Sequence, residues 1–79
     1  MPSSKAMLAT ALAKANTAVQ LDNTHSYTFA RKYYEESCLL LSQLVNRASN
    51  EKDKEKLRAI RETYLHRIEQ LGDLASEES

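Results

Sequence analysis

The segment from Ser26 to Ala48, SYTFARKYYEESCLLLSQLVNRA, decides the fold of this 79-residue chain. Apolar and small residues recur in it every three or four positions, the spacing of one helix face: Tyr27, Ala30, Tyr34, Ser37, Cys38, Leu41, Val45 and Ala48. A second stripe lies about a third of a turn away and consists of Phe29, Tyr33, Leu40 and Leu44. So wide an apolar arc predicts a central helix over residues 26–48. It either packs against two neighbours or leaves part of the arc to a ligand.

The segments on either side show the same helical period. Residues 4–21 predict a first helix with Ser3 or Ser4 as its N-cap. Its expected apolar side is Leu8, Ala11, Leu12, Ala15 and Val19, with Asp22 at the end. Residues 51–75 predict a third helix. Its expected core face is Leu57, Ile60, Tyr64, Ile68, Leu71 and Ala75.

Two short breaks, near residues 22–26 and 49–53, separate these helices. Short connections make successive helices antiparallel neighbours. The chain also has only one Gly and one Pro, too few for a sheet with tight turns. The sequence therefore predicts an all-α fold, an antiparallel up-down-up three-helix bundle over residues 3–75. Residues 76–79 are expected to begin a linker or tail.

Composition excludes several function classes. Eleven basic and eleven acidic residues give no net charge, whereas nucleic-acid binding usually needs a basic excess. The single cysteine, Cys38, cannot form an internal disulfide and indicates a reduced, cytoplasmic compartment. No apolar run is long enough to span a membrane. His25 and His66 lack partners at metal-ligand spacing, so we expect no metal, no cofactor and no catalysis by this domain itself.

The clearest candidate for binding is the run YLHRIEQL from Tyr64 to Leu71. Tyr64, Ile68 and Leu71 share one helix face, whereas Leu65 falls beside that face and Glu69 lies one turn beyond it. A leucine at the core edge followed by a carboxylate suits a groove for an apolar and basic peptide. Alternatively, Leu65 closes the core and Glu69 pairs with a neighbouring base.

With these motifs in hand, the chain resembles the MIT (microtubule-interacting and trafficking) domains. The resemblance rests on three matches: Asp22 closing the first helix, the Tyr27–Ala30–Tyr34 pattern opening the second, and the Tyr64–Leu71 run in the third. Arg61 and Ile68 depart from the family pattern.

The resemblance implies a three-helix module that binds MIT-interacting motifs, the C-terminal tail segments of ESCRT-III subunits. In one family mode, a helical tail lies between the second and third helices; in another, a proline-containing tail lies between the first and third. For the first mode, we expect the peptide-binding residues to be Leu65, Glu69, Arg61, Arg58, Leu40 and Leu44. The domain would then recruit a larger parent protein to endosomal membranes, without inserting into them itself.

Two alternatives remain at this stage. The stripe of Phe29, Tyr33, Leu40 and Leu44 could serve self-association or scaffolding, although we expect the isolated domain to be monomeric. A basic cluster in the third helix could bind nucleic acid, but acidic residues such as Asp53 and Glu55 interrupt it. No nucleic-acid partner is therefore expected.

Overall fold

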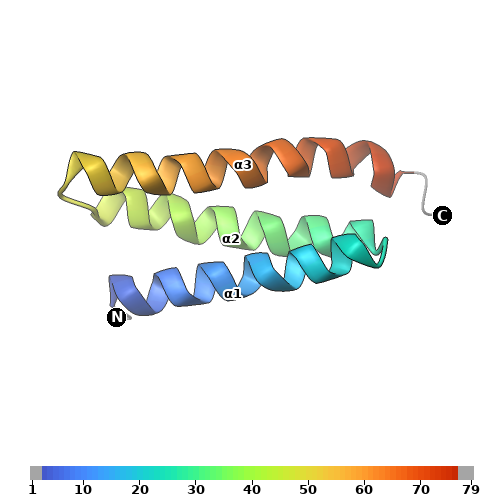
Figure 1. Cartoon of the computed structure of the whole chain (residues 1–79), viewed down its shortest axis with the longest axis horizontal. Helices are drawn as coiled ribbons and strands as arrows, with labels where there is room; N and C mark the ends of the chain where they lie inside the picture. The colour runs from blue at the N-terminus through green and yellow to red at the C-terminus, as the bar shows by residue number, and fades with distance from the viewer. Residues whose placement is uncertain (1–2, 77–79) are drawn as a thin grey trace.

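The computed structural model describes residues 3–76 of the chain, which form three α-helices. Their bounds are α1 Ser4–Asn23, α2 Tyr27–Arg47 and α3 Glu51–Ala75. The chain runs along α1, back along α2 and forward along α3, so α1 and α3 are parallel (Figure 1). The predicted all-α, up-down-up three-helix bundle is confirmed. Of the expected linker at residues 76–79, all but Ser76 lies outside the described residues.

Side-chain caps start two of the helices. The Ser3 hydroxyl oxygen accepts a hydrogen bond from the backbone N–H of Ala6 at 3.1 Å. At α3, the Asn50 side-chain oxygen accepts from the backbone N–H of Lys52 at 2.8 Å. Each cap satisfies a backbone donor that has no partner within its helix. These two polar residues therefore fix where α1 and α3 begin.

The turn from α1 into α2 is a Schellman motif. The backbone N–H of Ser26 donates to the carbonyl of Leu21 at 2.8 Å, and that of His25 donates to the carbonyl of Asp22 at 3.1 Å. His25 takes the left-handed conformation that this motif requires, with φ at 62°. The turn reverses the chain within a few residues, which makes α1 and α2 antiparallel.

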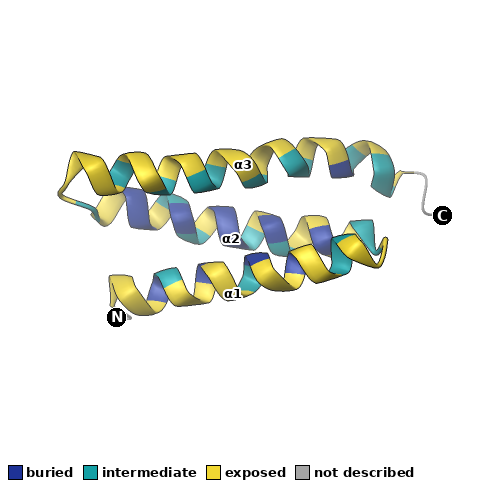
Figure 2. Ribbon diagram, in the orientation of Figure 1, coloured by how far each residue is buried: buried dark blue, intermediate teal, exposed yellow. Residues whose placement is uncertain are grey.

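The second helix, α2, lies between the other two and carries most of the buried residues (Figure 2). Two consecutive side chains contact opposite neighbours. The Ser37 hydroxyl donates to the Ala11 carbonyl of α1 at 2.7 Å, and the Cys38 thiol donates to the Arg61 carbonyl of α3 at 3.8 Å. Cys38 is buried, and burial raises the pKa of its thiol, which disfavours the reactive thiolate form. The boundary between the α1-facing and α3-facing sides of α2 thus runs between residues 37 and 38.

The helix α1 packs through its small residues, and this corrects the sequence-based core. Its buried residues are Met7, Ala11, Ala15 and Ala18. Leu12 and Val19, predicted to be core, are instead 42% and 41% exposed. Alanine has little side chain, so it lets the α1 backbone approach α2 closely. Leu12 and Val19 are consequently turned away from α2, whereas Met7 is the one large buried residue among the described residues of α1.

The helix α3 is only partly covered. Leu71 is its one fully buried residue in the described part of the chain, while Leu57, Ile60, Tyr64 and Ile68 are half-buried. In Figure 2, α3 is mostly yellow and teal along its length. The reason is that α3 packs on α2 and hardly approaches α1. A groove therefore remains between α1 and α3.

Candidate binding grooves beside α3

A groove between α1 and α3 contains two open hollows. The larger, of about 590 Å³, has apolar walls from all three helices: Leu8 and Leu12 of α1, Leu44 of α2, and Leu57 and Ile60 of α3. We call the surface formed by these residues, together with Val19 and Tyr64, the α1–α3 groove.

The smaller hollow, of about 450 Å³, continues the groove towards the C-terminal end of α1. Leu12 and Val19 line it from α1, and Tyr64 lines it from α3. Small residues, Ala9 and Ala13, lie beside them. Leu12, Val19 and Tyr64 together form an apolar surface that is open to water in the free domain. Covering such a surface with a partner is favourable.

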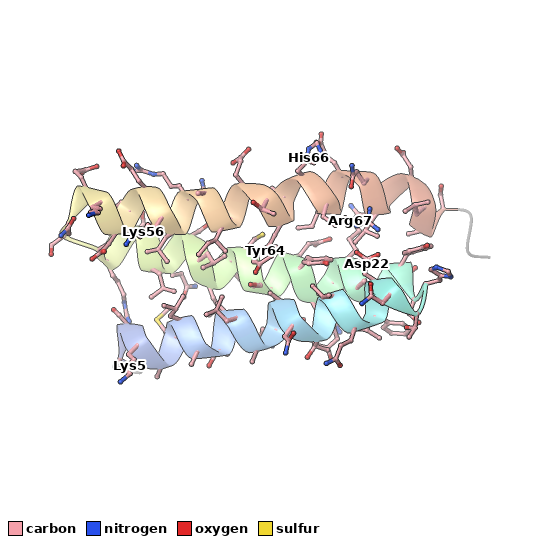
Figure 3. The ribbon with its side chains drawn as sticks, viewed as in Figure 1. Lys5, Asp22, Lys56, Tyr64, His66 and Arg67 are labelled. Atoms are coloured by element: carbon pink, nitrogen blue, oxygen red, sulfur yellow. The ribbon has the colours of Figure 1, made fainter. Side chains whose placement is uncertain are left out.

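An ion pair closes one end of the groove. The Arg67 guanidinium donates two hydrogen bonds to the Asp22 carboxylate, from Nη2 to Oδ1 at 2.6 Å and from Nε to Oδ2 at 2.7 Å. The Tyr34 hydroxyl donates to the same carboxylate at 3.3 Å. In Figure 3, Asp22 and Arg67 face each other across α1 and α3. This end of the groove is therefore bridged, and its charges are already paired.

The ion pair changes the protonation behaviour of its members. Hydrogen bonds from Arg67 hold the pKa of Asp22 below its ordinary value, against the opposing effect of burial. For Tyr34, burial and the Asp22 carboxylate raise the pKa to about 12. Asp22 is thus charged and Tyr34 neutral at physiological pH, the states in which this contact is strongest.

The other end of the groove is open and carries three basic residues. Lys5 of α1, Arg47 of α2 and Lys56 of α3 line the larger hollow there, together with one carboxylate, that of Asp53. Figure 3 shows Lys5 and Lys56 at the same end of the bundle, far from Asp22 and Arg67. The groove is therefore apolar along its length and basic at its open end.

The predicted residues of α3 lie on its other side, at the edge shared with α2. The Arg61 guanidinium donates to the Ser42 hydroxyl oxygen of α2 at 3.1 Å, and its Nε is buried without a hydrogen-bond partner. Leu65 is 39% exposed, and Glu69 is exposed. Arg58, Leu65 and Glu69 follow the helical spacing of Arg61 and so share its edge. The four predicted residues of α3 are brought together.

The two predicted residues of α2 do not join them. Leu44 is only 4% exposed and lines the α1–α3 groove, so its placement in the α2–α3 groove is wrong. Leu40 is half-buried against the same core cluster, and like Leu44 it follows Ser37 in helical spacing. Both lie on the α1-facing side of α2. The self-association stripe is likewise interrupted, because Leu44 is buried and only Phe29 is largely exposed.

The α2 residue found at this edge is Ser42, which sequence reasoning missed. It lies four residues after Cys38, so the α3-facing side of α2 can be traced from Cys38 once that contact is known. Arg31 and Glu35, paired at 3.1 Å, lie further along the same side by helical spacing. Leu39, which is 62% exposed, follows Glu35 by four residues and so lies beside them. This edge of α2 therefore combines polar residues with one exposed leucine.

Residues 3–76 hold no cluster of three or more His, Cys, Asp or Glu residues able to bind a metal ion. Nor does any of the three helices combine the length and apolarity needed to cross a bilayer.

Taken together, these features define a small helical-bundle module whose third helix is flanked by surfaces available to a partner. The family model described as the MIT (microtubule interacting and transport) domain matches residues 8–73, which is most of the chain. The chain therefore belongs to the MIT domain family, a family of protein-interaction modules. Searches of curated proteins and of solved structures found no match.

Proposed function

We propose that this domain binds short C-terminal MIT-interacting motifs of ESCRT-III subunits in grooves beside α3. It performs no catalysis itself but recruits its parent protein from the cytoplasm to endosomal and other membrane-remodelling sites. The observation that carries the proposal is the open apolar α1–α3 groove, with Leu12 and Val19 exposed on one wall and Tyr64 on the other. No partner within the described chain covers these side chains.

The apolar contacts set the scale of the affinity. Each leucine or valine of a ligand that becomes buried contributes roughly 1.5–3 kcal/mol. Binding also has a cost, because a peptide that places two or three such residues in the groove becomes ordered. The balance predicts dissociation constants on the order of micromolar to tens of micromolar. Such weak sites suit a polymer that presents many tails at once.

The edge between α2 and α3 is proposed as a second, weaker surface. Leu65 offers an exposed apolar contact, and Glu69 can pair with a basic residue of a ligand. An exposed pair of this kind contributes at most about 1 kcal/mol. Arg58 and Arg61 border this contact. Because apolar residues of all three helices line the α1–α3 groove, we expect that groove to dominate.

The test is an NMR titration of the labelled 79-residue chain with synthetic ESCRT-III tail peptides. Binding in the α1–α3 groove would shift the amide signals of Leu12, Val19 and Tyr64. Two matched variants assign the groove: Leu12→Asp should weaken binding at least tenfold, which corresponds to about 1.4 kcal/mol. Leu65→Asp should weaken it less. Both replaced side chains are substantially exposed, so circular dichroism should show unchanged helicity.

Other results would assign the ligand to a different groove or refute the proposal. Loss of binding in Leu65→Asp alone would assign the ligand to the α2–α3 groove. If no tail peptide shifts any signal, ESCRT-III tail binding is refuted. Self-association is examined in the same samples by sedimentation, where the wild-type chain should remain monomeric at tens of micromolar.

A further inference from the structure

We propose that the open end of the α1–α3 groove selects acidic peptides: Lys5 and Lys56 bind Asp or Glu side chains at one end of the bound segment. This inference rests on the proposed function in one respect, that a peptide occupies this groove. It adds the charge pattern of the ligand and its direction along α3.

The two lysines are placed to act on one ligand. They line the same hollow from opposite walls, Lys5 from α1 and Lys56 from α3. Neither forms a hydrogen bond or an ion pair with another residue of the described part of the chain. By contrast, Lys14 is paired with Glu36 at 3.1 Å and Lys54 with Glu51 at 3.6 Å. The charges of Lys5 and Lys56 are therefore not neutralised by the fold.

The surrounding groups leave this end positive. Arg47 adds a third cation, and its guanidinium donates to the Met7 sulfur at 2.9 Å. Asp53 is the one carboxylate among the residues of the hollow. Even without Arg47, Lys5 and Lys56 outnumber Asp53, and a carboxylate ligand would balance this local excess of positive charge. At the far end, Asp22 is already paired with Arg67, so the groove attracts negative charge at one end only.

The positions of these groups predict a pattern in the ligand. From Lys5 to Val19, α1 rises about 21 Å, at about 1.5 Å per residue. A segment of about 14 residues covers this distance even as a helix, and a shorter one does so when extended. Its acidic residues would lie at Lys5 and Lys56, and its apolar residues along Leu12 and Val19. A peptide with the reverse order would place its acids beside the bridged end.

The experiment measures dissociation constants for the full 79-residue chain. The ligand is the ESCRT-III tail peptide that shifts the α1 signals most strongly, with its C-terminus amidated. A second copy carries Asn or Gln in place of each Asp or Glu. We expect the neutral copy to bind about three- to tenfold more weakly, the range for a few exposed charge pairs. Raising the salt concentration should reduce the difference in affinity between the acidic and neutral copies, because salt screens exposed charges.

Protein variants locate the effect. Lys5→Glu and Lys56→Glu should each weaken binding of the acidic peptide by a similar factor. The affinity for the neutral copy should stay nearly unchanged. Lys32→Glu is the matched control, because Lys32 is exposed on α2 and does not line the hollow. A third copy with Lys in place of the acids should bind the Lys5→Glu/Lys56→Glu double variant more tightly than it binds the wild type. A merely destabilised protein would not show this exchange of preference.

Equal affinity of the acidic and neutral copies would overturn the inference while leaving peptide binding in place. An effect of Lys32→Glu as large as that of Lys5→Glu would overturn it too, because only net charge would then matter. If the lysine variants respond only to a peptide with a free C-terminal carboxylate, the chain end rather than an acidic side chain is bound. If no tail shifts the α1 signals, docking in the α1–α3 groove fails together with this inference.

Discussion

Asp22 and Arg67 join the end of α1 to α3 by a pair of short, charge-assisted hydrogen bonds. The Asp22 side chain is only 13% exposed and that of Arg67 35% exposed. Two parallel bonds between a guanidinium and a carboxylate hold a fixed geometry as well as contributing energy. Because α1 and α3 otherwise approach each other little, this pair sets their spacing at one end of the groove.

Replacing Asp22 by Asn should therefore lower the free energy of unfolding at neutral pH. The change keeps the side-chain size but removes the charge. Hydrogen bonds to charged groups contribute about 1.5–3 kcal/mol, so a loss within this range is expected. Urea denaturation at pH 7, followed by circular dichroism, measures it. Glu69→Gln is a suitable control, because it removes an exposed charge from the same bundle.

The difference in the free energy of unfolding between Asp22→Asn and the wild type should also depend on pH. The pKa of Asp22 is lowered in the folded protein from an ordinary value of 3.8. The carboxylate therefore contributes its full stability above about pH 5, and loses it as the pH falls through the lowered folded-state pKa. The two proteins should approach equal stability as the pH falls below that lowered pKa. A difference that stayed constant from pH 7 to pH 2 would show that packing, not charge, is responsible.

At the scale of a helix, α1 shows which part of an amphipathic pattern the sequence can predict. The sequence predicted the helical period, an N-cap at Ser3 or Ser4, and the burial of Ala11 and Ala15. It wrongly added Leu12 and Val19 to the buried face. Leu12 and Val19 are larger than Ala11 and Ala18, and larger apolar residues are usually the core. Here the alanines are buried because α1 and α2 pack closely. The distance between the two helices depends on both of them, so it cannot be predicted from the apolar pattern of α1 alone.

This packing predicts different costs for two leucine-to-alanine changes. Leu41 is fully buried, whereas Leu12 is 42% exposed. Leu41→Ala should lower the free energy of unfolding by about 2–5 kcal/mol, because it leaves a cavity. Leu12→Ala should cost less than about 1 kcal/mol, since the groove is already open. Thermal and urea unfolding of both variants measure the contrast. Equal costs would place Leu12 in the core after all.

At the scale of the whole molecule, the handedness of the bundle decides which groove each residue of α2 lines. Three antiparallel helices can be arranged with the third on either side of the first pair, and both arrangements bury the same stripes. Arg61 needs no such information to be grouped with Leu65 and Glu69, because helical spacing within α3 alone places the three on one edge. The placement of Leu44 failed because it required knowing whether that side of α2 faces α1 or α3. The Ser37 and Cys38 contacts supply this information.

The incomplete cover of α3 has a consequence for stability. A ligand in the α1–α3 groove would cover Ile60 and Tyr64, both half-buried in the free domain. A ligand that binds only the folded state adds about 2.7 kcal/mol to the free energy of unfolding at a concentration about 100 times Kd. In a domain of this size, that shift raises Tm by on the order of 10–20 °C. Differential scanning calorimetry with a saturating tail peptide measures it.

The variant Leu12→Asp provides the comparison for this measurement. It places a charge in the groove without removing a buried group, so the free domain should keep a Tm near that of the wild type. The same peptide concentration should then raise its Tm much less, because the apolar contact is lost. An undiminished rise in this variant would mean that the peptide stabilises the bundle from another surface, such as the edge containing Leu65. The size of the remaining shift therefore separates the two grooves beside α3 by a thermodynamic measure independent of chemical shifts.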